Sequence, residues 1–157
     1  MSSRMAGSAR EDRAKLGYRI LNWIGIVEQL ARTKANRTLA ELGLPWPQFV
    51  LLNHFSHRPD EGKMVTEVAR AMQQNQPGIS KTVKAMVESG ILEVVADDRD
   101  RRVKRLFLTP QGRATHAEAL ARLAPMVADS FAGWSTEEMA EAFQALDRLK
   151  VYLDDNR

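Results

Sequence analysis

The apolar residues of this chain change their spacing once. Up to Gly90, and again after Pro110, they recur every three or four residues, which is the period of amphipathic helices. Between these points, residues 91–95 and 103–108 are rich in β-branched and large apolar side chains, and they flank the charged stretch 97–102. The pattern predicts one β-hairpin with a long charged tip in a helical chain. The expected fold class is therefore mainly α with a small β-hairpin (α+β).

Six helices are predicted around this hairpin. Thr109 and Pro110 start the fifth, because proline at the first helical position loses no hydrogen bond. Asn75 is expected to cap the fourth helix, and Ser135 begins a capping box before the sixth. Pro125 is expected to kink or divide the fifth helix. The expected bounds are about residues 11–43, 48–55, 65–72, 75–89, 109 onward and 135–153.

Length and composition bound the classes of protein that the chain can be. Its 157 residues suit one domain, which we expect over residues 11–153, after a mobile polar tail over residues 1–10. The absence of cysteine excludes disulfides, thiolate metal sites and thiol-based redox sensing. No apolar stretch approaches the roughly 18 residues of a membrane span, and the start lacks the apolar core of a signal peptide. We expect a cytoplasmic location and no membrane partner.

The short third and fourth helices form a predicted helix-turn-helix. The exposed first turns of the fourth helix carry Gln, Ser and Lys, and such a helix fits the major groove of DNA, which is about 12 Å wide. The hairpin that follows would be a wing, whose tip over residues 97–105 holds five basic and three acidic residues. Each feature alone is equally typical of an ordinary helix pair or a solvated tip. The net charge of +3 is compatible with a polyanionic partner.

Several short segments of residues 11–153 follow the sequence pattern of one known protein family. The resemblance is most specific in the wing, in Asp97-Asp98-Arg99-Asp100-Arg101-Arg102 and in the Leu-Thr-x-x-Gly series Leu108-Thr109-Pro110-Gln111-Gly112. Further similar segments are Leu44-Pro45-Trp46-Pro47-Gln48-Phe49, Glu67-Val68-Ala69, Ser80-Lys81-Thr82-Val83 and Gly90-Ile91-Leu92. Residues 11–153 thus resemble the MarR family of winged helix-turn-helix transcriptional regulators. The resemblance implies a DNA-binding repressor, with residues 44–108 as the DNA-binding lobe and residues 11–43 and 109–153 as dimerisation helices.

The resemblance also implies which residues contact double-stranded DNA. On the recognition helix, Gln76 is expected to recognise adenine, Lys81 guanine and Lys84 a phosphate. In the wing, Asp100 is expected to orient Arg102, which would enter the minor groove. The full set of expected DNA-binding residues is Asn75, Gln76, Pro77, Gly78, Ser80, Lys81, Lys84, Arg99, Asp100, Arg101, Arg102 and Lys104.

The chain departs from the family's pattern at two places. Pro77 and Gly78 stand where polar residues are often found, so the operator would be read partly by its shape. Neither Lys63 nor Met64 is a capping residue, so the third helix is expected to start raggedly.

The first and last helices carry more apolar surface than the small lobe can cover. Their stripes span residues 16–31 and 139–151, and we expect them to form a homodimer. Twofold symmetry would then place two recognition helices on the half-sites of a pseudo-palindromic operator, about one helical turn apart. The alternative is that both stripes pack within their own domain.

The resemblance further implies a small-molecule effector that releases DNA, often an aromatic carboxylate, bound where the first, second and fifth helices meet. The residues expected to line this site are Arg19, Trp23, Trp46, Phe49, Asn53 and His116. The alternative for the aromatic residues, and for Trp134, is an ordinary place in the hydrophobic core.

Metal-dependent and enzymatic functions find little support. His54 and His57 lie close to Asp60 and Glu61, a spacing compatible with a metal site, but most such pairs are solvated, and we expect no metal and no cofactor. No phosphate-binding loop, zinc-protease motif or nucleophile elbow occurs, so we do not expect an enzyme. The alternative function is a dimeric winged-helix module that binds a protein partner.

Overall fold

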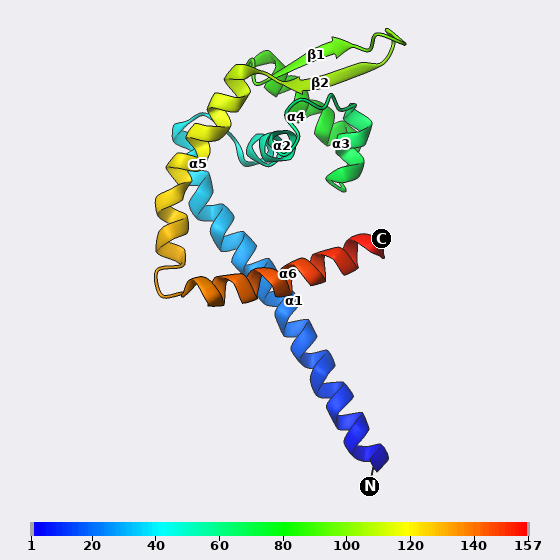
Figure 1. Ribbon diagram of the computed structural model, residues 1–157, viewed down its shortest axis with the longest axis vertical. Helices are drawn as coiled ribbons and strands as arrows, with labels where there is room; N and C mark the ends of the chain where they lie inside the picture. Colours follow the sequence, from blue (N-terminus) through cyan, green and yellow to red (C-terminus); the bar gives the residue numbers. More distant parts are fainter. Residues whose placement is uncertain (1, 157) are drawn as a thin grey trace. The chain divides into compact units, whose positions relative to one another are not determined.

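The computed structural model describes residues 2–156, with side chains from residue 11 onward. Within this part of the chain, six helices and two strands follow the predicted order (Figure 1). They are α1 (Ser2–Glu41), α2 (Trp46–Ser56), α3 (Val65–Ala71), α4 (Gln76–Glu88), β1 (Leu92–Ala96), β2 (Lys104–Leu108), α5 (Pro110–Ser130) and α6 (Thr136–Asp155). The predicted fold class is confirmed. The predicted mobile tail over residues 1–10 lies outside the described side chains and stays a prediction.

The chain divides into two compact units, residues 1–123 and 124–157. In the first unit, α2, α3 and α4 pack together beside the β1–β2 hairpin (Figure 1). The core of this lobe is built from large apolar side chains that α2 and α4 bury at helical spacing, chiefly Leu52, Phe55, Ile79 and Met86. Among the described side chains of α1, from residue 11 onward, only Ala35 and Leu39 in the last turns are buried in this core.

The hairpin is antiparallel, with Leu92 opposite Leu108 and Val94 opposite Leu106. A third, single-residue strand completes the wing. The N–H of Lys63 donates to the carbonyl of Leu106 at 3.1 Å, and the N–H of Leu106 donates back at 2.9 Å. The sequence did not predict this bridge, which ties the base of the wing to the loop before α3.

Helix α5 begins where the sequence predicts, because the Thr109 hydroxyl accepts from the N–H of Gly112 at 2.9 Å and caps the first turn. Gly112 is buried against the preceding chain, and a Cβ built on it would lie 2.3 Å from the carbonyl oxygen of Ile91. The sequence therefore needs glycine here for close approach. Pro125 does not divide the helix, which continues to Ser130.

In the second unit, the predicted capping box opens α6. The Ser135 hydroxyl accepts from the N–H of Glu138 at 3.2 Å, and the Glu138 carboxylate accepts from the N–H of Ser135 at 2.8 Å. No residue of α6 is buried. None of the helices in the described part of the chain combines the length and the apolar character that crossing a membrane requires.

A place in the hydrophobic core, which the sequence favoured for the tryptophans, is wrong for Trp23 and Trp134. Trp23 is 58% exposed and Trp134 is 49% exposed, whereas Trp46 is half-buried and Phe49 is buried. Trp134 packs edge-to-face on Phe131, with 5.5 Å between the ring centroids. Trp23 and Trp134 therefore keep much of their apolar surface free for a further contact.

Candidate nucleic-acid interface

The turn between α3 and α4 is tightly specified. Gln73 adopts a left-handed conformation, with φ of 51°, which non-glycine residues seldom do. Asn75 then caps α4, because its side-chain oxygen accepts from the N–H of Gly78 at 2.8 Å. This confirms the predicted cap. The two helices are thus held at the short spacing of a helix-turn-helix.

Helix α4 separates its residues cleanly between two faces. Ile79, Val83 and Met86 are buried against the lobe. The residues expected to contact DNA are all exposed: Asn75, Gln76, Pro77, Gly78, Ser80, Lys81 and Lys84. The Lys84 ammonium lies 3.8 Å from the Glu88 carboxylate, a weak surface pair that would have to loosen before the lysine could hold a phosphate.

The start of α3 is more ordered than the sequence predicted. Met64 cannot cap the helix with its side chain, but the Glu67 carboxylate accepts from the N–H of Met64 at 2.7 Å. One half of a capping box therefore satisfies a free backbone donor without a Ser or Thr. The expectation of a ragged start is wrong, because it considered the cap residue and not the acid three positions later.

In the wing, Asp100 acts on the backbone of Arg102. Its carboxylate accepts from the N–H of Arg102 at 2.9 Å, and its carbonyl accepts from the N–H of Val103 at 2.9 Å. No ion pair joins the two side chains in the described part of the chain. Asp100 therefore fixes the turn from which Arg102 projects and leaves the guanidinium free for a partner.

The basic side chains of the wing tip are available for binding. Arg99, Arg101, Arg102 and Lys104 are exposed. Among the described carboxylates, none lies within ion-pair distance of these four groups. Four unpaired cations thus project from one short hairpin, a typical footprint for a polyanion.

Asp97 and Arg105 form a pair that the sequence did not predict as functional. The Nε of Arg105 donates to Asp97 at 2.7 Å, and its Nη1 donates to the carbonyl of Gly62 at 3.2 Å. This hydrogen bond from Arg105, and then one from the N–H of Arg99, lower the pKa of Asp97 below its ordinary value. The pair joins the two strands of the wing to the loop before α3. Asp97 and Arg105 are eight residues apart, but Gly62 is 43 residues from Arg105, so no local pattern predicted the link to this loop.

The six residues expected to bind an effector lie in two regions. The rings of Trp46 and Phe49 lie 5.7 Å apart, and the side chains of Asn53 and His116 are joined by a hydrogen bond of 2.6 Å. Burial lowers the pKa of His116. Arg19 and Trp23 instead lie on the exposed part of α1, at least about 18 Å along the helix from Ala35.

Trp46 lines a cleft of about 480 Å³ at the junction of α1 and α2. Asn36, Ala40 and Pro47 form other parts of its wall. A volume of this size holds a small aromatic molecule. None of the other five expected effector residues lines this cleft.

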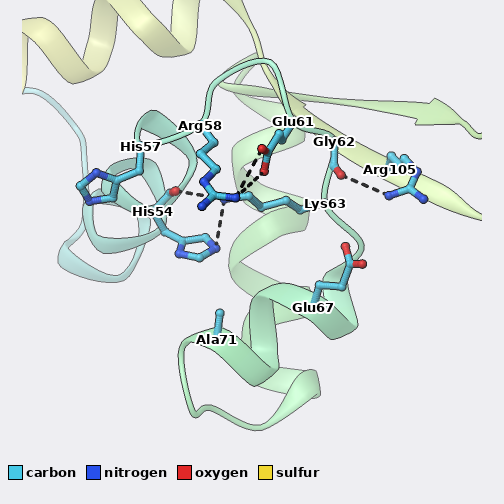
Figure 2. Close-up of a pocket in the computed structure, with 9 residues that line it drawn as sticks. All are labelled: His54, His57, Arg58, Glu61, Gly62, Lys63, Glu67, Ala71 and Arg105. Carbon is cyan, nitrogen blue, oxygen red and sulfur yellow. Dashed lines mark hydrogen bonds and ion pairs between the residues drawn. The ribbon is translucent and has the colours of Figure 1, made fainter. Parts of the chain in front are cut away.

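His54 and His57 lie beside a second cleft, of about 540 Å³, between the end of α2, the loop before α3 and the base of the wing (Figure 2). In the described part of the chain, no group of three or more possible metal ligands gathers here or elsewhere. The nearest partner of His54 is a cation, since the Lys63 ammonium lies 3.4 Å from its Nε2. Burial, and then Lys63, lower the pKa of His54.

Comparison with protein families matched residues 42–103 to the MarR family. These residues run from the end of α1 to the wing tip, and they include the helix-turn-helix. Comparison with curated protein sequences gave no match.

Solved structures of transcriptional regulators are similar in fold. The transcriptional regulator PA3341 is 26% identical, with a TM-score of 0.72 over 87% of this chain and 98% of that chain. The regulator SlyA is 19% identical, with a TM-score of 0.75 over 87% and 95%. MepR from Staphylococcus aureus, in a complex with DNA, is 18% identical, with a TM-score of 0.67 over 82% and 91%.

Proposed function

We propose that this protein is a transcriptional regulator that binds double-stranded DNA, because residues 42–103 match the MarR family that the sequence resembles. The observation that carries the proposal is the pairing of an exposed polar face on α4 with four unpaired cations in the adjoining wing. A helix with Gln76, Ser80 and Lys81 on its outer face can read base edges in a major groove. The wing arginines can enter a minor groove or hold phosphates.

The regulator would bind as a homodimer. Large apolar side chains on α1 and α6 remain exposed, among them Leu30 at 62% and Phe143 at 70%. They recur every three or four residues, so they form continuous stripes of the kind that monomeric proteins rarely leave in water. A twofold dimer covers both copies of each stripe and presents two α4 helices to a pseudo-palindromic operator.

We also propose that a small molecule controls DNA binding. The cleft beside Trp46 lies where α1 meets the lobe, so a ligand there would change the angle between the two. We propose an aromatic carboxylate as the effector, a repressor role, and a cytoplasmic location where chromosomal DNA is reached. In this scheme, Trp46→Ala blunts release of DNA by the effector and leaves ligand-free binding largely intact.

Fluorescence anisotropy with labelled genomic fragments at two salt concentrations tests the proposal. Affinity should fall steeply as salt rises, because Lys and Arg displace counterions from DNA. Arg102→Ala should weaken binding by about 1 to 3 kcal/mol, the range of one good groove contact. The control Arg148→Ala, which removes an exposed cation from α6, should bind as the wild type does.

Two variants of α4 separate base reading from phosphate holding. Lys84→Ala should weaken binding to all sequences alike and lower the salt slope by about one, whereas Gln76→Ala should change the preferred base at one position of each half-site. A chain that binds no duplex at low salt would contradict the proposal and favour a module that binds a protein partner.

A further inference from the structure

The cleft between the end of α2, the loop before α3 and the base of the wing gathers several basic groups (Figure 2). His54 comes from the end of α2, Arg58 from the loop that follows it, Lys63 from the loop before α3, and Arg105 from β2. These groups are brought together from three parts of the fold. None of them belongs to the predicted DNA-binding or effector residues.

Lys63 has no strong partner in this cleft. Its ammonium donates to the carbonyl oxygen of His54 at 3.3 Å and faces His54 Nε2 at 3.4 Å, both long contacts with neutral groups. It also lies 5.6 Å from the centre of the Phe55 ring. In the described part of the chain, no carboxylate lies within ion-pair distance of Lys63. Burial is the main reason that its pKa lies below the ordinary value.

The two carboxylates of the cleft are already engaged. The Glu67 carboxylate accepts from the N–H of Met64 at 2.7 Å and so caps α3. Glu61 meets Arg58 at 3.4 Å, but these side chains are 57% and 70% exposed, so water competes with their weak pair. Arg58 can therefore turn to another anion at little cost. Arg105 is held by Asp97 and Gly62 and contributes its charge from a fixed position.

We propose that this cleft binds a phosphate group, held by Lys63, Arg58 and the ring of His54. A phosphate carries up to two negative charges on three oxygens, which matches two cations and a ring nitrogen that approach from different elements. The cleft volume of about 540 Å³ leaves room for a phosphorylated small molecule. A phosphate of the DNA backbone is a diester, so it offers one negative charge on two non-bridging oxygens to the same cations.

A phosphate bound in this cleft would affect the stability of the wing. The backbone of Lys63 is paired in both directions with Leu106 of β2, so the residue that holds the phosphate is also the third strand of the wing. A bound phosphate that draws the Lys63 side chain toward Arg58 would stabilise the base of the wing. Binding of a DNA phosphate in this cleft requires the DNA-binding function proposed above. Binding of a free phosphorylated ligand does not require it.

Titration of the full chain with inorganic phosphate, without DNA and at constant ionic strength, tests whether the cleft binds free phosphate. The NMR signals of His54 should shift and saturate at millimolar phosphate. Lys63→Met should weaken this binding about tenfold, the effect of one charge-assisted contact, and so should Arg58→Gln, which lies on an exposed loop and spares the fold. The control Lys34→Met removes an exposed cation of α1 and should leave binding unchanged.

The salt dependence of duplex binding, measured with the same variants, tests whether the cleft holds a phosphate of the DNA backbone. If free phosphate does not saturate the site, Lys63→Met should lower the salt slope by about one, and Lys34→Met should not. Absence of both effects would overturn the proposal, as would equal responses in Lys63→Met and Lys34→Met. The first titration contains no DNA, so its outcome is independent of whether the protein regulates transcription.

Discussion

Replacing Gly112 with alanine should destabilise the junction between the wing and α5. The added Cβ would lie 2.3 Å from the Ile91 carbonyl oxygen and 2.7 Å from Cδ1 of Leu108. An ordinary C···O contact is about 3.3 Å, so the carbonyl must move by about 1 Å. That carbonyl accepts from the N–H and the hydroxyl of Thr109, both at 3.1 Å, so the movement also weakens these bonds.

The expected size of the effect follows from three opposing contributions. Overpacking costs about 1 to 3 kcal/mol, and weakening a hydrogen bond costs about 1 kcal/mol more. Alanine is favoured over glycine inside a helix by about 0.5 to 1 kcal/mol, which offsets part of the loss. The net destabilisation is about 1 to 3 kcal/mol. For a chain of this length, it lowers Tm by about 2 to 12 °C.

Thermal unfolding followed by circular dichroism measures this change, at equal protein concentrations because a dimer's Tm depends on concentration. Gly133→Ala is the matched control, since no heavy atom lies within 4 Å of its added Cβ and its φ is not positive. Its Tm should stay the same or rise slightly. If Gly112→Ala unfolds at the wild-type temperature, the close approach at Ile91 does not constrain the fold and the reasoning is refuted.

Four further predictions concern association, DNA binding, capping and pH. Phe143→Glu should convert the dimer into monomers in sedimentation experiments, because it places a charge on the exposed stripe of α6; an unchanged mass would place the interface elsewhere. Asp97→Asn should weaken duplex binding although it removes a negative charge, because the wing loses its tie to Arg105; tighter binding in anisotropy would show that charge repulsion dominates. Asn75→Ala should cost about 1 kcal/mol in urea unfolding, and Asn75→Asp should restore it. Burial lowers the pKa of His116 below 6.5, so its contribution to stability is present above pH 6.5 and is lost as the pH falls through the folded-state pKa. The Tm of His116→Gln should therefore fall less steeply with acid than the Tm of the wild type.

The features that the sequence predicted correctly depend on neighbours along the chain. The caps at Asn75 and Ser135 are local chemistry, in which a side chain satisfies backbone donors three residues later. The hairpin was visible because its period differs from that of the helices. The buried and exposed faces of α4 likewise followed from its spacing.

The features that the sequence missed depend on contacts between distant residues. The bridge from Lys63 to Leu106 is a strand of one residue, which has no period to detect. Arg105 meets Gly62 across 43 positions, and the cleft around Lys63 is lined by residues from α2, the loop before α3, α3 and β2. The placement of Trp23 could not be decided either, since burial of a residue on α1 depends on what covers the helix.

The length of α1 beyond its buried end has a mechanical consequence. The helix contains no proline and runs unbroken from Ser2 to Glu41, but of its side chains from residue 11 onward only Ala35 and Leu39 are buried in the lobe. The 24 residues before Ala35 form a rod about 36 Å long, at 1.5 Å per residue. A tilt of about 5° at the anchored end therefore displaces the other end by about 3 Å. Small angular changes at the junction with α2 would be amplified like those of a lever arm.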